Sequence, residues 1–93
     1  YSQLGKMFLD AGDVRKAEKC FNNASEHFIK LGNAPGEAAV LRLLADVYIH
    51  VADRVSAIRC LERVVFLATH YKLPELNRDL EALNYIRQSA ARP

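Results

Sequence analysis

The side chains best suited to chemistry in this 93-residue chain are three histidines and two cysteines. His27, His50 and His70 lie far apart, and none has a further ligand residue at a spacing that would share one helix face. Cys20 and Cys60 have no histidine nearby in sequence that could activate a thiol. The alternative is that a cysteine and a histidine distant in sequence meet in the folded protein. We interpret both cysteines instead as small, semi-buried thiols. We therefore expect no metal, no cofactor and no enzyme activity.

The remaining polar residues point the same way. The four glycines are dispersed and fit helix packing or helix ends, not a loop that cradles phosphate. The Asp and Glu residues resemble solvated or capping groups. Net charge is +2, and both signs are interspersed along the chain, whereas a nucleic-acid binder gathers its basic residues on one face. A convex ladder of basic residues is the alternative, formed by Arg15, Lys16, Lys19, Arg54, Arg59 and Arg63.

The location of the protein is inferred from its cysteines and its hydropathy. The longest stretch without a formal charge, residues 64–71, is far too short to span a bilayer. Nothing resembles a secreted disulfide framework, because the two cysteines would lie on separate, equivalent helices. We expect a cytoplasmic protein with no membrane segment. The chain opens inside a helical pattern, so the first helix is predicted to be truncated.

Five amphipathic helices must position these residues. We predict them at 1–11, 14–31, 34–51, 54–71 and from 74 onward, with Asp13 and Asp53 as N-caps and Gly12 as a C-terminal stop. Apolar residues recur at helical spacing in three of them. The predicted buried stripes are Ala17, Phe21, Ala24, Phe28 and Leu31; Val55, Ile58, Leu61, Val64, Val65 and Ala68; and Leu76, Leu80, Leu83 and Ile86. Asp79 falls on the predicted polar face of the last helix.

The helical hairpin repeats after forty positions, which is the signature of a stacked array. On these residues the chain resembles the tetratricopeptide repeat, whose first helix carries Leu-Gly and aromatic positions and whose second carries Ala and an aromatic. The two matching series are Tyr1, Leu4, Gly5, Phe8, Gly12, Asp13, Ala17, Phe21 and Ala24, then Leu41, Leu44, Ala45, Tyr48, Ala52, Asp53, Ala57, Leu61 and Val64.

The resemblance implies an all-α fold in which antiparallel helical hairpins stack as a right-handed TPR-like α-solenoid of about five helices. The family period is about 34 residues, so a period of forty resembles a longer variant found in some G-protein-regulating and receptor-clustering scaffolds. We predict a single TPR-like domain over 1–93. Its parts are repeat 1 at 1–33, repeat 2 at 34–73, and a capping helix or the start of a third repeat at 74–93.

The resemblance further implies a protein-interaction module or scaffold fragment that binds a peptide or partner helix in a concave groove lined by the first helix of each hairpin. The predicted peptide-binding residues are Lys6, Leu9, Asp10, Arg42, Asp46, Ile49, His50 and Tyr85. Lys6 with Asp10, and Arg42 with Asp46, are alternatively spaced to pair on their own helices. Asp46 would repel a peptide carboxylate, so the tail-binding clamp of chaperone-associated members of the family is not expected.

A structural role is the second hypothesis. The repeats could be a spacer within a longer helical-repeat protein, or could self-associate as a homo-oligomer through uncapped ends, since an array end without a polar cap tends to find a partner.

Overall fold

The computed structural model describes the backbone of residues 2–91 and the side-chain environment of residues 5–89. Within that range the fold is all-α, as predicted, and contains no strand. The predicted contacts of Tyr1 and Leu4 lie outside the described side chains. The helices are α1 (Ser2–Asp10), α2 (Val14–Leu31), α3 (Ala34–His50), α4 (Arg54–His70) and α5 (Leu76–Ala91).

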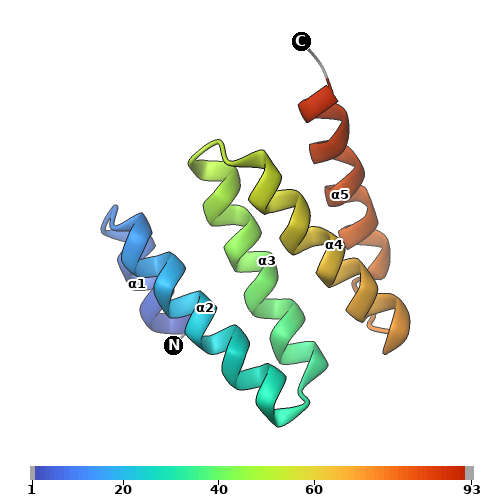
Figure 1. Ribbon diagram of the computed structural model, residues 1–93, viewed down its shortest axis with the longest axis horizontal. Coiled ribbons are helices and arrows are strands. Elements are labelled where there is room, and N and C mark those ends of the chain that lie inside the picture. The colour runs from blue at the N-terminus through green and yellow to red at the C-terminus, as the bar shows by residue number, and fades with distance from the viewer. Residues whose placement is uncertain (1, 92–93) are drawn as a thin grey trace.

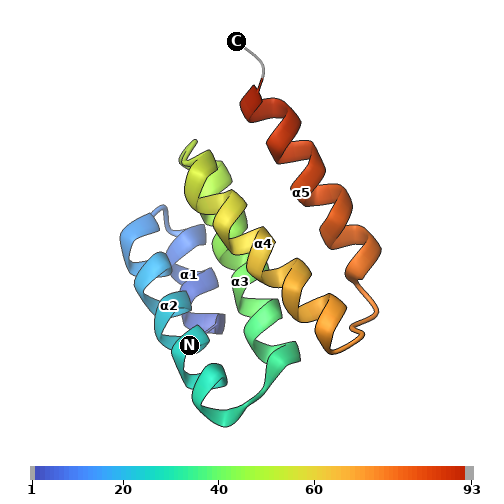
Figure 2. The same ribbon diagram turned by 45° about the vertical axis from the view of Figure 1, so that its right-hand side comes forward.

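The helices form two layers. Each helix packs against the next one in the chain, so α1 contacts α2, α2 contacts α3, α3 contacts α4 and α4 contacts α5. The molecule is a slab with Cα extents of 32 × 32 × 16 Å, and its thin dimension suits two layers of helices at the usual axial spacing of about 8–10 Å. Figures 1 and 2 show consecutive helices running in opposite directions.

The turns recur with a strict period of twenty residues. Positive φ angles occur at Gly12 (83°), Gly32 (67°), Ala52 (60°) and Lys72 (54°). After each one, a backbone N–H reaches back to a carbonyl five residues earlier, as in a Schellman motif. The pairs are Asp13 to Phe8, Asn33 to Phe28, Asp53 to Tyr48 and Leu73 to Ala68, at 2.7–2.9 Å. The forty-residue repeat is therefore two copies of one helix-and-turn unit.

The side chain that follows the left-handed residue then caps the next helix. Asp13 accepts from the Lys16 N–H, Asn33 from Gly36 and Asp53 from Ser56, at 3.0–3.2 Å. Leu73 occupies the fourth such position and cannot cap. The helix after it begins late, at Leu76, which corrects the expectation that Pro74 opens the fifth helix.

Replacing Ala52 by glycine is expected to stabilise the protein. An L-residue in the left-handed region costs about 1 kcal/mol, which glycine relieves at some cost in unfolded-state entropy. We expect Ala52→Gly to add roughly 0.5–1 kcal/mol and to raise Tm by about 4 °C. The reverse change, Gly12→Ala, should lower Tm by a similar amount, because a Cβ at Gly12 meets nothing within 4 Å and only its φ angle is strained. Equal Tm values for Ala52→Gly and wild type in a thermal melt would contradict this account.

The core is built from small residues placed opposite large ones. Phe21 and Ala17 are fully buried in a cluster that joins α2, α3 and α4. A second cluster joins α3, α4 and α5 through Ala45, Leu61, Leu83 and Ile86. A Cβ on Gly5 would lie only 2.5 Å from the Phe21 ring, so α1 approaches α2 closely because this residue has no side chain.

Two groups of residues differ from the predicted burial pattern. Leu31, Val55 and Leu80 were expected in buried stripes, but they are 63, 63 and 38% exposed. Leu31 and Val55 are the last and the second residues of their helices, where no neighbouring helix covers them. Glu37 and Asp79 were expected to be solvated, and both are buried, with exposed fractions of 5 and 4%. The reason is that each is bonded to an arginine of another helix.

Candidate functional site

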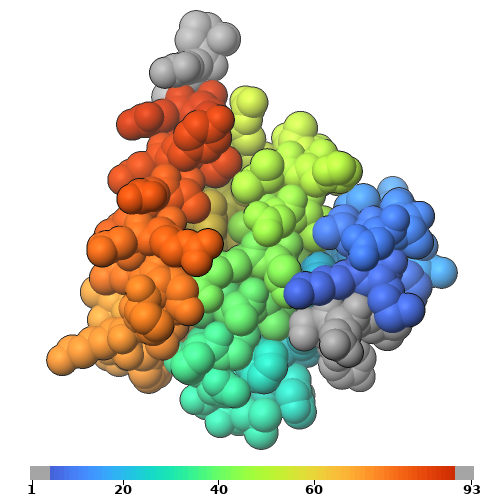
Figure 3. All heavy atoms as spheres, turned by 180° about the vertical axis from the view of Figure 1, so that it is seen from behind, coloured from blue at the N-terminus to red at the C-terminus, as the bar shows by residue number. Residues whose placement is uncertain are grey.

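The face formed by α1, α3 and α5 carries most of the predicted binding residues. Seen from behind, α3 runs down the centre of this face with α5 on one side and α1 on the other (Figure 3). A furrow runs between α3 and α5, where two pockets of about 370 and 190 Å³ lie along it. Leu61 of α4 contributes to the first pocket, so α4 forms the floor of the furrow.

An ion-pair network crosses the furrow at one end, where its residues line the pocket of about 370 Å³. Arg42 of α3 donates from Nε and Nη2 to the two carboxylate oxygens of Asp79 on α5, each at 2.8 Å. Glu75 lies 3.7 Å from the same guanidinium. These hydrogen bonds raise the pKa of Arg42 above its ordinary value. Arg42 thus joins α5 to α3, and it does not form the predicted pair with Asp46 on its own helix.

The other end of the furrow holds the smaller pocket. The structure brings together Ile49 of α3 and Tyr85 of α5, which line the pocket of about 190 Å³. They are 42 and 70% exposed, so both present large apolar surfaces to solvent. Arg54, at the start of α4, lines the same pocket and supplies a positive charge beside it.

The predicted residues on α1 and at the end of α3 are more scattered. Lys6 and Asp10 are exposed on α1, and His50 is exposed as the last residue of α3. Leu9 is half-buried against the core cluster, which leaves little of it to contact a ligand. Within residues 5–89, Lys6 forms an ion pair with neither Asp10 nor Asp46.

Asp46 lies on α3 between Arg42 and Ile49. Neighbouring protein atoms partly desolvate its carboxylate and raise its pKa above the ordinary value. No hydrogen bond or ion pair to it is formed within residues 5–89. The middle of α3 therefore offers an acceptor for a positively charged or hydrogen-bonding group.

The raised pKa of Asp46 makes the stability of the fold depend on pH. An acid whose pKa is raised by folding binds more protons in the folded state, so stability falls as pH rises from the unfolded pKa through the folded one. We expect Asp46→Asn to raise Tm at pH 7, with the gain shrinking to nothing at a pH below the unfolded pKa of about 3.9. Thermal melts at several pH values measure this. A gain from Asp46→Asn that persists unchanged in acid would show that the carboxylate charge is not its cause.

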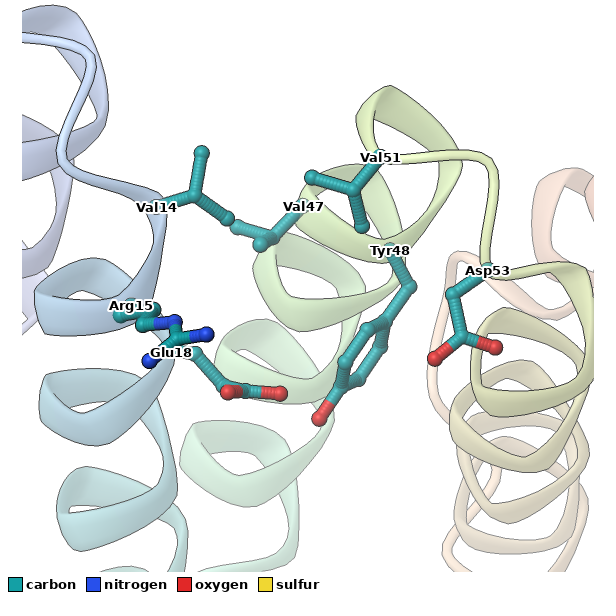
Figure 4. A pocket seen from close by; sticks show the side chains of 7 residues that line it. All are labelled: Val14, Arg15, Glu18, Val47, Tyr48, Val51 and Asp53. Carbon is teal, nitrogen blue, oxygen red and sulfur yellow. The ribbon is translucent and has the colours of Figure 1, made fainter.

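A further pocket of about 320 Å³ opens away from this face, between the start of α2 and the end of α3 (Figure 4). Val14, Val47 and Val51 line its apolar side, and the Glu18 carboxylate faces the Tyr48 hydroxyl. Burial, and then the Glu18 carboxylate, raise the pKa of Tyr48 to about 12. Of the charged side chains that line it, Asp53 caps α4 through Ser56.

The described residues offer little for catalysis. No cluster of three or more His, Cys, Asp or Glu side chains among them could hold a metal ion. Cys20 and Cys60 are half-buried and unpaired, and burial raises the pKa of the Cys60 thiol to about 11, which disfavours a reactive thiolate. None of the helices in the described range is long and apolar enough to cross a membrane.

Asp79 and Arg54 are among the furrow residues that sequence reasoning missed. Asp79 was assigned to a solvent face because the period of α5 was read from its leucines. The positions of the two acids within their helices indicate the burial of Asp79. Asp79 is the fourth residue of α5, and the buried Glu37 is the fourth residue of α3. Arg54 was placed on the convex side, and only the turn between α3 and α4 brings it to the furrow.

The two-layer stack of antiparallel helices, with one face formed by the first helix of each hairpin, defines an α-helical repeat protein. Comparison with known families agrees: a family profile described as tetratricopeptide repeat matches residues 1–69. The chain belongs to the tetratricopeptide repeat family. No curated protein and no solved structure matched it.

Proposed function

We propose that this chain is a protein-interaction module that binds a peptide or a partner helix in the furrow between α3 and α5. Tetratricopeptide repeats are typically non-catalytic modules for protein–protein contact, which supports the general role. The observation that carries the specific proposal is the pocket shared by Ile49 and Tyr85. Two exposed apolar side chains on facing helices give a bound segment an anchor.

The charges along the furrow define how a partner would lie. The apolar pocket takes an apolar side chain of the partner, and Arg54 stands next to it for an acidic group or a backbone carbonyl. Asp46 would accept from a basic or polar group on the neighbouring turn of the partner. Arg42 holds α5 in position and does not contact the ligand in this proposal. Lys6 and Asp10 on α1 remain available to a segment long enough to cross α3.

The test is a comparison of captured partners between two matched variants. Ile49→Asp places a charge in the furrow, and Val55→Asp makes the same kind of change at an exposed residue of α4 outside it. Proteins retained from a cell lysate by wild type and by Val55→Asp, but lost by Ile49→Asp, would support the proposal. We expect the affinity of a recovered partner segment to fall about tenfold or more, the loss typical of an apolar anchor.

Tyr85→Ala should reduce the same affinities, while the circular dichroism of every variant stays helical. Identical partners and affinities for Ile49→Asp and Val55→Asp would reject the furrow as the binding site. If wild type itself elutes as a dimer that Ile49→Asp dissociates, the furrow is a self-association surface and the peptide proposal is wrong.

A further inference from the structure

The pocket between the start of α2 and the end of α3 shares no lining residue with the two pockets of the furrow. Val14, Val47 and Val51 form an aliphatic wall along it, and Val51 is 47% exposed, so this wall continues to the protein surface. The volume of about 320 Å³ lies near the lower end of the range for ligand sites, roughly 300–1,000 Å³. The pocket therefore has room for one long aliphatic side chain that enters from solvent.

A carboxylate without a cation stands beside this wall. Glu18 is half-buried on α2, and its carboxylate faces the Tyr48 hydroxyl (Figure 4). In the part of the chain that the structure describes, Glu18 forms no ion pair. Partial burial removes some of the water around a carboxylate, and a cation in the pocket would compensate for that loss. A donor that follows the valines inward would meet one charged and one neutral oxygen.

The groups around the inner side of the pocket experience negative charge. Burial, and then the Glu18 carboxylate, raise the pKa of Tyr48. Burial, and then Asp53 and Glu18, raise the pKa of the Cys60 thiol. A cation close to either group would lower its pKa, so the contribution of these acids indicates a negative potential where the ligand would bind.

Arg15 also lines the pocket and is the basic group with which a ligand would compete. Its side chain is exposed, and within residues 5–89 it forms no ion pair with Glu18. Asp53 is less available, because its hydrogen bonds with Ser56, and more weakly the charge of Arg59, lower its pKa. Glu18 is therefore the carboxylate that a ligand would meet.

We propose that this pocket binds the side chain of a lysine from a partner protein. The methylene groups of such a side chain pack along the valines, and its ammonium donates to the Glu18 carboxylate and the Tyr48 oxygen. An arginine fits less well, because its planar guanidinium carries five N–H donors and needs more acceptors than these two groups supply. The general role of the family in protein–protein contact is consistent with such a partner. The site lies apart from the furrow, so it does not depend on the function proposed above.

The test is an NMR titration of the isotope-labelled chain with N-acetyl-lysine N-methylamide at about 0.15 M salt. The matched probe is the same compound with an acetylated ε-amine, which keeps the aliphatic stem and removes the charge. We expect saturable shifts centred on residues 14–18 and 47–51. A Kd of about 1 mM is the affinity that a ligand of this size reaches. The acetylated compound should bind about tenfold more weakly or not at all.

Three variants locate the charge that is recognised. Glu18→Gln should weaken binding of the lysine compound about tenfold, whereas Glu26→Gln, the same change at an exposed acid further along α2, should leave the affinity unchanged. Arg15→Gln should strengthen binding about threefold, because it removes the competing cation. Circular dichroism checks that each variant stays helical. The Ile49→Asp variant should bind the lysine compound normally, which separates failure of this proposal from failure of the furrow.

Several results would overturn the proposal. They are equal binding of the charged and acetylated compounds, shifts that spread over the surface without saturating, and equal affinities for Glu18→Gln and Glu26→Gln. Saturable binding of hexylammonium without binding of the lysine compound would assign the pocket to a free aliphatic amine instead of a partner protein. Tighter binding of N-acetyl-arginine N-methylamide would show that the pocket selects a guanidinium, and the lysine assignment would be wrong.

Discussion

Arg42→Ala is expected to destabilise the protein by about 3 kcal/mol, because it leaves the Asp79 carboxylate buried without a partner. The Asp79 side chain is only 5% exposed and receives two hydrogen bonds from this one guanidinium. In a domain of this size the change corresponds to a fall in Tm of about 15 °C. Since α5 packs on α4 and meets α3 through this pair, hydrogen exchange should show the largest loss of protection at residues 79–89.

The surface pair between Arg87 and Glu62 is the matched control. It also links α5 to another helix, at 2.6 Å, but its side chains are 50 and 49% exposed. Arg87→Ala should cost no more than about 0.5 kcal/mol. A double variant, Arg42→Met with Asp79→Leu, should recover most of the loss, since apolar residues of similar volume replace a buried pair with little penalty. Equal effects of Arg42→Ala and Arg87→Ala would contradict the burial that underlies this prediction.

Gly5→Ala is expected to lower stability by about 2 kcal/mol, although alanine is the better helix former. The new Cβ would lie 2.5–2.9 Å from three carbons of the Phe21 ring, which is fully buried and cannot move aside. The fall in Tm should be about 10 °C in a thermal melt. In the second repeat the residues equivalent to Gly5 and Phe21 are Ala45 and Leu61, which pack in one cluster. Phe21→Leu should therefore lower stability less in the Gly5→Ala variant than in the wild-type protein.

Gly36→Ala provides the comparison for that experiment. A Cβ there would lie 2.6 Å from the Phe28 ring, nearly as close as in the first case. Phe28 is only half-buried, so its ring can shift towards solvent and the substitution should cost less than Gly5→Ala. If Gly36→Ala lowers stability more than Gly5→Ala does, the freedom of the opposing Phe ring to move does not determine the loss of stability. Additive effects of Gly5→Ala and Phe21→Leu would likewise show that the two positions do not share one space.

The concave furrow was only partly predictable. Ile49, Asp46 and Tyr85 were identified as groove residues because first helices line the inner face in the repeat pattern, but their use as a binding site remains a proposal. Arg42 was also predicted to be a groove residue, but in the structure its guanidinium donates two hydrogen bonds to Asp79. The residues are 37 positions apart, so no local spacing links them. Whether a charge on an inner helix is free for a ligand depends on how close the next helix comes.

The first four helices and the family were predictable from local sequence patterns, whereas the start of α5 was not. Asp13 and Asp53 cap the predicted helices, and Gly12 ends its helix, because these interactions span fewer than six residues. Contacts between helices determine which charges are buried and which apolar side chains remain exposed. Glu37 is buried because a distant arginine reaches it across the stack, and Val55 is exposed because no helix covers the start of α4. Helix formation is governed by neighbours along the chain, whereas burial is governed by neighbours in space, and only packing of the hairpins fixes those.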